Sequence, residues 1–227
     1  MKKRIKKIYS EFDKTKLYSL EDGVDVAMSS STAKFDETID IAINVNVDPK
    51  KGEQNVRGKI QLPKSLGNIV KVCVFANADK QDEAKEAGAD IIGGDELVEK
   101  VQGGFTDFDR CIATPDMMAK VGKLGQVLGP RGLMPNPKLG TVTTNVKKAV
   151  EDAKAGELEY KTSGIVIHSG VGKSKFNKDE LVSNIKFFVE TISKDRPAGV
   201  KGEFIKAVSI SPTMGPGIKL DLGSLGI

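Results

Sequence analysis

Apolar and polar residues alternate most clearly between residues 39 and 47. Isoleucine or valine occupies every odd position, and the even positions are mostly polar. A period of two is typical of a strand with one buried face. An antiparallel strand of this kind leaves its second face free for solvent or for a partner. The pattern therefore predicts a half-buried strand over residues 39–47.

The last third of the chain has the patterns of two more strands and a helix. The segment 165–168 is largely β-branched, and the segment 200–211 ends in apolar residues that alternate with serines. Between these segments, Asn177 and Glu180 have the spacing of a helix N-cap and its reciprocal acid. The apolar residues that follow recur at spacings of four and three: Leu181, Ile185, Phe188 and Ile192. An amphipathic helix is therefore expected over residues 177–192.

The middle of the chain alternates between strand and helix patterns. The successive elements are a strand at 70–74, a helix from Asp79 to Gly88, a second helix from about Asp95, and a buried strand at 111–113 that leads into Thr114-Pro115. This βαβα order predicts a small α/β layer structure with parallel pairing. Residues 63–68 and Gly156 are plausible hinges, so we interpret the middle as an insertion into an outer domain.

Charge is distributed unevenly along the 227 residues, although the formal net charge is only +4. Residues 1–16 contain seven basic and two acidic residues, and residues 156–227 contain ten and eight. Three segments contain no acid: 117–150, 160–178 and 204–220. Binding to a polyanion requires a local basic field more than a large total charge. The two ends of the chain are therefore the better candidates for such a surface, although Gly- and Pro-rich loops also exclude acids by chance.

Several other classes of protein are disfavoured by the sequence. No apolar run approaches the length of a bilayer span, and the first residues lack the apolar core of a signal peptide. A cytoplasmic protein with no membrane association is therefore expected. Cys73 and Cys111 are interpreted as small buried hydrophobic residues and not as a disulfide.

Catalytic motifs are weak. The run from Gly170 to Ser174 resembles the end of a P-loop, but Ile167 stands where the first glycine of that loop is needed. His168 is the sole histidine, and neither a nucleophile motif nor a zinc ligand set surrounds it. We therefore expect no catalytic residue, no cofactor and no metal. The alternatives are a nucleotide-binding α/β enzyme that uses the middle domain, and a middle domain that docks a protein or tRNA.

Three short segments suit RNA, although each has a plainer interpretation. His168 stands among glycines, hydroxyls and lysines, but it is equally interpreted as a strand residue at the edge of a core. Phe35 is as compatible with a core position as with stacking. The acid-free turn 211–217 is either an RNA contact or an ordinary loop. With 5% aromatic residues and no Trp, recognition is expected to depend on shape, backbone and 2′-OH contacts.

Nearly all of the chain, from Lys16 to Gly217, resembles the bacterial large-subunit ribosomal protein L1 family. The segments that carry the resemblance are 33–38 (AKFDET), 47–50 (VDPK), 57–58 (RG), 86–90 (EAGAD), 112–116 (IATPD), 122–142 (GKLGQVLGPRGLMPNPKLGTV) and 213–215 (TMG). A match of this length does not arise by chance.

The resemblance implies an α/β fold with two domains. Residues 1–65 and 156–227 would form a discontinuous outer split β-α-β sheet domain that binds RNA, and residues 66–155 would form an inserted Rossmann-like α/β domain. It also implies a non-enzymatic role in the 50S ribosomal subunit: direct binding to large-subunit rRNA at the mobile L1 stalk and release of deacylated exit-site tRNA. Repression of translation by binding the mRNA of its own ribosomal-protein operon is a further implied role.

The resemblance also implies which residues contact RNA. They are Lys34, Phe35, Thr38, His168, Gly172, Lys173, Ser174, Thr213, Met214 and Gly215. A weaker contact would come from the loop at 122–140, through Lys123, Arg131 and Lys138. Two segments depart from the family pattern: 161–167 is less charged and one residue shorter, and 65–68 has one glycine fewer than the Gly-rich family hinge and does not end in its lysine.

Overall fold

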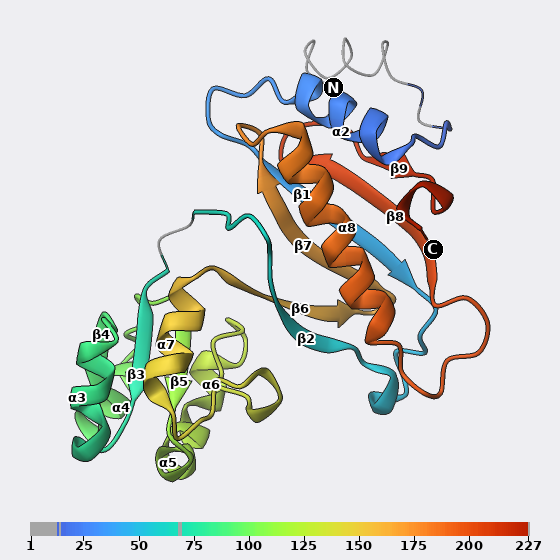
Figure 1. Cartoon of the computed structure of the whole chain (residues 1–227). Coiled ribbons are helices and arrows are strands. Elements are labelled where there is room, and N and C mark those ends of the chain that lie inside the picture. Colours follow the sequence, from blue (N-terminus) through green and yellow to red (C-terminus); the bar gives the residue numbers. More distant parts are fainter. Residues whose placement is uncertain (1–12, 14, 68–69, 227) are drawn as a thin grey trace. The chain divides into compact units, whose positions relative to one another are not determined.

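The protein is described by a computed structural model that covers residues 13, 15–67 and 70–226 (Figure 1). Most of the Lys-rich start of the chain and Asn68 of the first predicted hinge lie outside the described residues. The chain forms two compact units: one consists of the chain up to Leu66 and from Leu158, and the other is Gly67–Glu157. Near these boundaries, Gly67 and Gly156 adopt positive φ angles of 67° and 89°, which glycine tolerates best. That the units act as separate domains, over 1–65 with 156–227 and over 66–155, stays a prediction.

The first unit contains a six-stranded sheet in the order β2-β6-β7-β1-β8-β9. Its elements are α2 (Leu20–Ser30), β1 (Thr38–Val45), η1 (Gly52–Gln54), β2 (Arg57–Gln61), β6 (Glu157–Ser163), β7 (Val166–Lys173), α8 (Lys178–Lys194), β8 (Ile205–Pro212), β9 (Ile218–Leu220) and η5 (Gly223–Leu225). The central strand β1 pairs antiparallel with β7 on one side and with β8 on the other. The strand predicted at 39–47 is therefore confirmed as the central strand β1, although it ends at Val45 and not at Val47.

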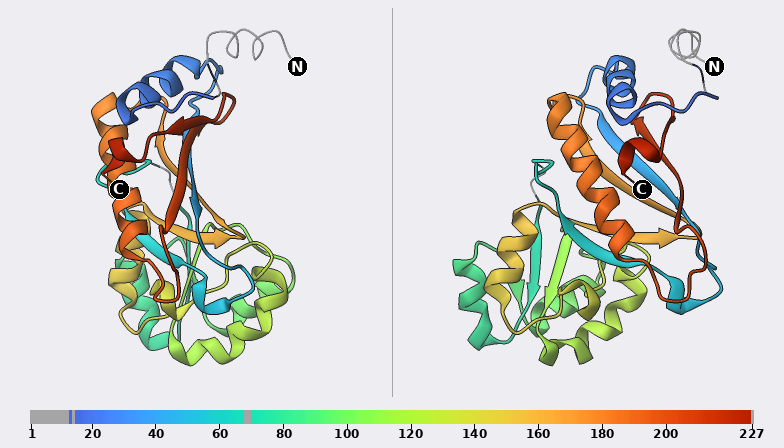
Figure 2. Two further views of the ribbon diagram at one scale, coloured as in Figure 1. Left: turned by 90° about the vertical axis from the view of Figure 1, so that its right-hand side faces the viewer. Right: turned by 45° about the vertical axis from the view of Figure 1, so that its right-hand side comes forward.

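One face of the sheet is covered by helices, and the other is left uncovered along β1 by the part of the first unit that the structure describes. Ile39, Ile41 and Ile43, at odd positions of β1, share one hydrophobic core with residues of α2 and α8. Figure 2 shows α8 lying along that face. Asp40, at an even position, is exposed, and Ala42 and Asn44 are half-buried. The alternation in the sequence thus corresponds to a covered and an uncovered face, as the period of a strand requires.

Two boundaries in this unit were tested by the structure. The helix predicted over 177–192 is confirmed as α8, and Glu180 accepts a hydrogen bond from the N–H of Asn177 at 3.2 Å, as a capping box requires. The strand predicted over 200–211 was wrong at its start, because β8 begins at Ile205. Residues before it form a loop in which Gly202 has a φ of 74°, which is incompatible with an extended strand.

The second unit is an α/β structure around the parallel three-stranded sheet β4-β3-β5. Its elements are β3 (Val72–Phe75), α3 (Ala78–Glu86), β4 (Ile91–Gly93), α4 (Asp95–Gln102), β5 (Arg110–Ala113), η2 (Pro115–Met117), α5 (Met118–Val121), η3 (Gly122–Leu124), α6 (Gly125–Leu128), η4 (Pro137–Leu139) and α7 (Val146–Lys154). The predicted βαβα order is confirmed. Two hydrophobic clusters contain most of the buried apolar residues of this unit.

The two cysteines are neighbours in this parallel sheet. Cys73 on β3 is in register with Cys111 on β5, and both are buried and free. Burial raises the pKa of the Cys111 thiol, and its hydrogen bond with Cys73 adds to the shift. A higher pKa lowers the thiolate fraction of Cys111. Both cysteines are buried and form no disulfide, so they act as small core side chains, as the sequence predicted.

Candidate nucleic-acid interface

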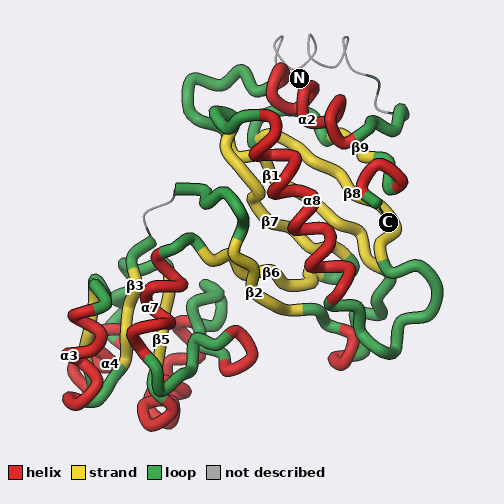
Figure 3. The backbone as a smooth tube through the Cα atoms, in the orientation of Figure 1, coloured by secondary structure: helices red, strands yellow, loops and turns green. Residues whose placement is uncertain are grey.

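Three loops meet at one end of the sheet in the first unit. They are residues 31–37 between α2 and β1, 174–177 between β7 and α8, and 213–217 between β8 and β9 (Figure 3). Because β1 runs antiparallel to both neighbours, its first residue lies beside the last residues of β7 and β8. We call residues 31–38, 173–177 and 212–217 the three-loop end. It contains most of the predicted RNA contacts.

Glu37 connects all three loops. Its side chain is only 1% exposed. Oε1 accepts a hydrogen bond from the N–H of Ala33 at 2.8 Å, and Oε2 accepts one from the N–H of Met214 at 2.8 Å. Its backbone N–H donates to Oγ of Ser174 at 3.2 Å, and its carbonyl accepts from the N–H of Ser174 at 2.8 Å. Hydrogen bonds to a carboxylate are stronger than neutral ones, so this buried acid fixes the loops relative to one another.

Thr38 and Thr213 extend the pairing of β1 and β8 into the loop. The N–H of Thr38 donates to Oγ1 of Thr213 at 3.0 Å, and the carbonyl of Thr38 accepts from the N–H of Thr213 at 3.0 Å. Lys173 joins them, because its Nζ donates to Oγ1 of Thr38 at 3.0 Å. An ammonium has three donors, so this contact leaves Lys173 able to bind a phosphate as well.

Two large apolar side chains project from these fixed loops. Phe35 is 55% exposed and Met214 is 46% exposed. The alternative in which Phe35 belongs to the core is therefore wrong. Lys34, next to Phe35, is also exposed. Exposed apolar groups that are held rigidly and rimmed by polar residues mark interaction sites, because covering them removes apolar surface from water.

The uncovered face of the sheet continues from this end. His168 on β7 is exposed and is in register with Ala42, two positions along β1 from Asp40. Desolvation raises the pKa of the Asp40 carboxyl, while Lys173 and His168 act in the opposite direction. His168 and Lys173 therefore flank one carboxylate on a face that is open to a partner.

The comparison with protein families supports the same kind of partner. The model of the "Ribosomal protein L1p/L10e family" matches residues 27–216, which include the first two loops, the third loop up to Pro216, and the whole second unit. The chain belongs to this family. Members of the L1p/L10e family are structural, RNA-binding proteins of the ribosome and not a class of enzymes, so this chain is a ribosome-associated protein that binds rRNA. No helix within the described ranges is long and apolar enough to cross a membrane.

Two glycines of the L1p/L10e pattern have a packing explanation. Gly172 is buried, and a Cβ at this position would collide with the side chain of Leu181 on α8. A Cβ at Gly215 would collide with the ring of Pro212. Both positions thus require glycine before any RNA is considered. Their contact with RNA stays a prediction. Gly172 lets β7 pack closely against α8, and Gly215 lets the 213–217 loop pack closely against Pro212.

The remaining predicted contacts lie in different places. The hydroxyl of Ser174 donates to Oδ1 of Asp36 at 2.9 Å, so it belongs to the three-loop end. In the second unit, Lys123 is exposed in η3, and Arg131 is exposed in the turn after α6, where its guanidinium contacts Thr106. Lys138 is part of η4, and its side chain lies outside the described part of the chain.

Sequence reasoning missed Glu37, the residue that organises the site. The negative charge of Glu37 is opposite to the local basic field that favours binding to a polyanion. The signal that was available is its position: it is flanked by Lys34-Phe35 and Thr38, all of which the family resemblance had selected. In the L1p/L10e chain described here, the acid faces backbone N–H groups and not the exterior.

Proposed function

We propose that this protein binds large-subunit rRNA directly through the three-loop end. The observation that carries the proposal is the pair of exposed side chains, Phe35 and Met214, on loops that the buried Glu37 holds together. A preformed apolar pair binds with little loss of conformational entropy. Lys34 and Lys173 would neutralise phosphates at its rim.

The mode of recognition follows from what the three-loop end offers. A single aromatic ring does not provide a platform for several bases, so Phe35 and Met214 would fill one depression in a folded RNA and exclude water from it. Thr38, His168, Ser174 and Thr213 would contact sugars and phosphates through hydroxyl, ring and backbone groups. Such contacts recognise the shape of a helical junction more than its sequence.

The finer roles come from the family resemblance. The protein would be part of the cytoplasmic 50S subunit, where the rRNA it binds would form the mobile L1 stalk that acts on deacylated exit-site tRNA. The second unit would add a weaker RNA contact through Lys123, Arg131 and Lys138. A leader mRNA of the ribosomal-protein operon would compete for the three-loop end. Repression therefore predicts that one set of variants weakens rRNA and mRNA binding in parallel.

A gel-shift titration against the stalk rRNA junction tests the proposal. Met214→Asp places a charge within the apolar pair and should weaken binding by about tenfold or more, because it removes a central anchor. The matched control is Phe187→Asp, since Phe187 is similarly exposed at 41% but lies on α8, which covers the other face of the sheet. Equal affinities for the two variants, both folded by circular dichroism, would contradict the proposal.

A further inference from the structure

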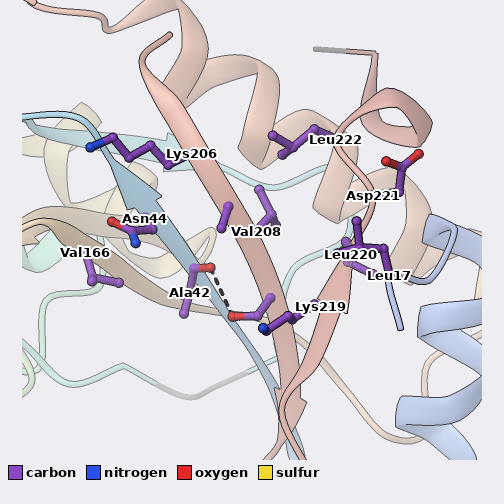
Figure 4. A pocket seen from close by; sticks show the side chains of 12 residues that line it. Leu17, Ala42, Asn44, Val166, Lys206, Val208, Lys219, Leu220, Asp221 and Leu222 are labelled. Atoms are coloured by element: carbon purple, nitrogen blue, oxygen red, sulfur yellow. Dashed lines mark hydrogen bonds between the residues drawn. The ribbon is translucent and has the colours of Figure 1, made fainter. Parts of the chain in front are cut away.

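A hollow lies on the uncovered face of the sheet in the first unit (Figure 4). Its volume is about 580 Å³. Leu17, Ala42, Asn44, Val166, Lys206 and Lys219 are among the residues that line it. Asn44 is near the end of β1, so the hollow is at the opposite end of that strand from Thr38. We call it the Asn44 hollow.

We propose that the Asn44 hollow binds an unpaired nucleotide of the same rRNA that the three-loop end grips. This inference rests on the proposed function, because it extends that interface along the uncovered face. Three properties of the hollow match the three parts of a nucleotide: cations for the phosphate, an apolar wall for the base, and an acceptor without a partner for the N–H groups of the base.

The cations come from two strands. Lys206 on β8 and Lys219 on β9 are both exposed, and the ammonium group of neither forms an ion pair or hydrogen bond with any residue that the structure describes. Asp221 is the acid of the lining, and its Oδ2 accepts a hydrogen bond from the N–H of Ser224 at 3.2 Å. Two unpaired ammonium groups beside one occupied carboxylate favour an anionic ligand.

The wall and the acceptor favour a base. Leu17, which is 58% exposed, and Val166 provide aliphatic surface against which a flat ring can pack. Oδ1 of Asn44 is shielded from solvent and accepts no hydrogen bond from the described residues. Buried acceptors nearly always have a donor, so this one indicates a missing partner. Because χ2 of asparagine is broad, the amide can turn its oxygen towards the amino or imino group of a base.

The hollow is continuous with the three-loop end. Thr38 and Asn44 are six positions apart along β1, a distance of roughly 20 Å at the rise of a strand. Between them the uncovered face contains Asp40 and Ala42, and their neighbours across the strands are Gly170, His168, Ser209 and Ser211. All of these side chains except His168 are short, and His168 is one of the proposed RNA contacts, so an RNA backbone could follow the sheet from one site to the other. A peptide or a second protein molecule would not need both lysines.

The test compares two double variants in the full chain. Lys206→Ala with Lys219→Ala should weaken binding to the stalk rRNA junction by about tenfold and reduce the slope of log K against log salt by roughly 1.4 to 1.8. Lys186→Ala with Lys194→Ala is the control, because both lysines are exposed on α8, which covers the other face. It should change neither quantity.

A spectroscopic measurement on the folded wild-type protein complements these variants. The NMR signals of the Asn44 side-chain amide should shift when the RNA is added, because Oδ1, which has no hydrogen-bond donor in the free protein, accepts a hydrogen bond from a base. Asn44→Leu, with its fold verified by circular dichroism, should weaken RNA binding by about fivefold and leave the salt slope unchanged, since no charge is lost.

The outcomes separate this inference from the proposed function. Wild-type affinity and slope in the Lys206/Lys219 variant, or unchanged Asn44 amide signals, would overturn the hollow as a nucleotide site. If Met214→Asp still weakens binding in that case, the three-loop end binds the RNA without a contribution from the Asn44 hollow. Wild-type affinity for Met214→Asp would instead overturn the proposed function.

Discussion

The three-loop end of the first unit, which contains Asp36 and Glu37, and the acid-free segment 117–150 of the second unit differ in both charge and structure. In the second unit, apolar side chains of the segment, such as Leu124 and Leu128, are buried in the core. Lys120 is paired with Asp95 at 2.6 Å. The three-loop end instead exposes Phe35 and Met214 and buries an acid. Fixed, exposed apolar groups therefore indicate a binding surface better than a run without acids does.

The largest expected effect concerns Glu37. Glu37→Ala leaves two loop N–H groups without their acceptor, which should lower the free energy of unfolding by about 2 to 4 kcal/mol. RNA affinity should fall by at least about thirtyfold, which equals roughly 2 kcal/mol, because the 31–37 and 213–217 loops lose the carboxylate that joins them. Urea unfolding and a gel-shift titration measure the two effects. Glu190→Ala, an exposed acid on α8, is the control. A folded Glu37→Ala protein with wild-type RNA affinity would show that the buried acid does not organise the three-loop end for binding.

An intermediate effect is expected in the second unit. Lys123→Ala with Arg131→Ala removes two exposed cations and should weaken rRNA binding by about fivefold while lowering the salt slope by roughly 1.4 to 1.8. The measurement is a titration at several salt concentrations. A loss greater than that of Glu37→Ala would reverse the ranking of the two regions. An unchanged slope would mean that neither side chain touches a phosphate.

The smallest effect concerns Asp40 and pH. Desolvation holds the pKa of the Asp40 carboxyl above the usual 3.8 in the folded protein. The unfolded state therefore releases its proton at a lower pH than the folded state does. As a result, the folded protein loses stability as the pH rises from below 3.8 through the raised pKa. Asp40→Asn removes this cost. The variant should be slightly more stable than the wild type at pH 7, and the difference should disappear at pH 3. Thermal unfolding at both pH values measures it, and a variant less stable at pH 7 would contradict the assignment.

Strong local patterns made much of the fold predictable. The alternation at 39–47, the capping box at Asn177 and the βαβα order of the middle each have a local physical cause. The helix α2 was not predicted, because its sequence LEDGVDVAMSS contains a glycine and β-branched residues that lower helix propensity. Its packing explains it: a Cβ at Gly23 would collide with the side chain of Leu220, so glycine permits the close approach of α2 and β9.

The candidate site was predictable only in part, for a related reason. Phe35, Lys173 and Met214 come from loops that the family resemblance selected one at a time. What makes them one surface is Glu37, which bonds to residues 137 and 177 positions away along the chain. Contacts at such separations have no periodic signature in the sequence. The Asn44 hollow likewise depends on the pairing of β1 with β8, which local patterns do not specify.

The central claim is that Phe35 acts as an exposed anchor on a fixed loop. Phe187 on α8 is the natural comparison, because it is 41% exposed and Phe35 is 55% exposed, whereas only Phe35 lies at the three-loop end. The decisive measurement is the affinity of the Phe35→Ala and Phe187→Ala proteins for the same stalk rRNA fragment at one salt concentration. The account predicts a loss of more than about tenfold for Phe35→Ala and less than about twofold for Phe187→Ala. Equal affinities of the two variants would contradict it.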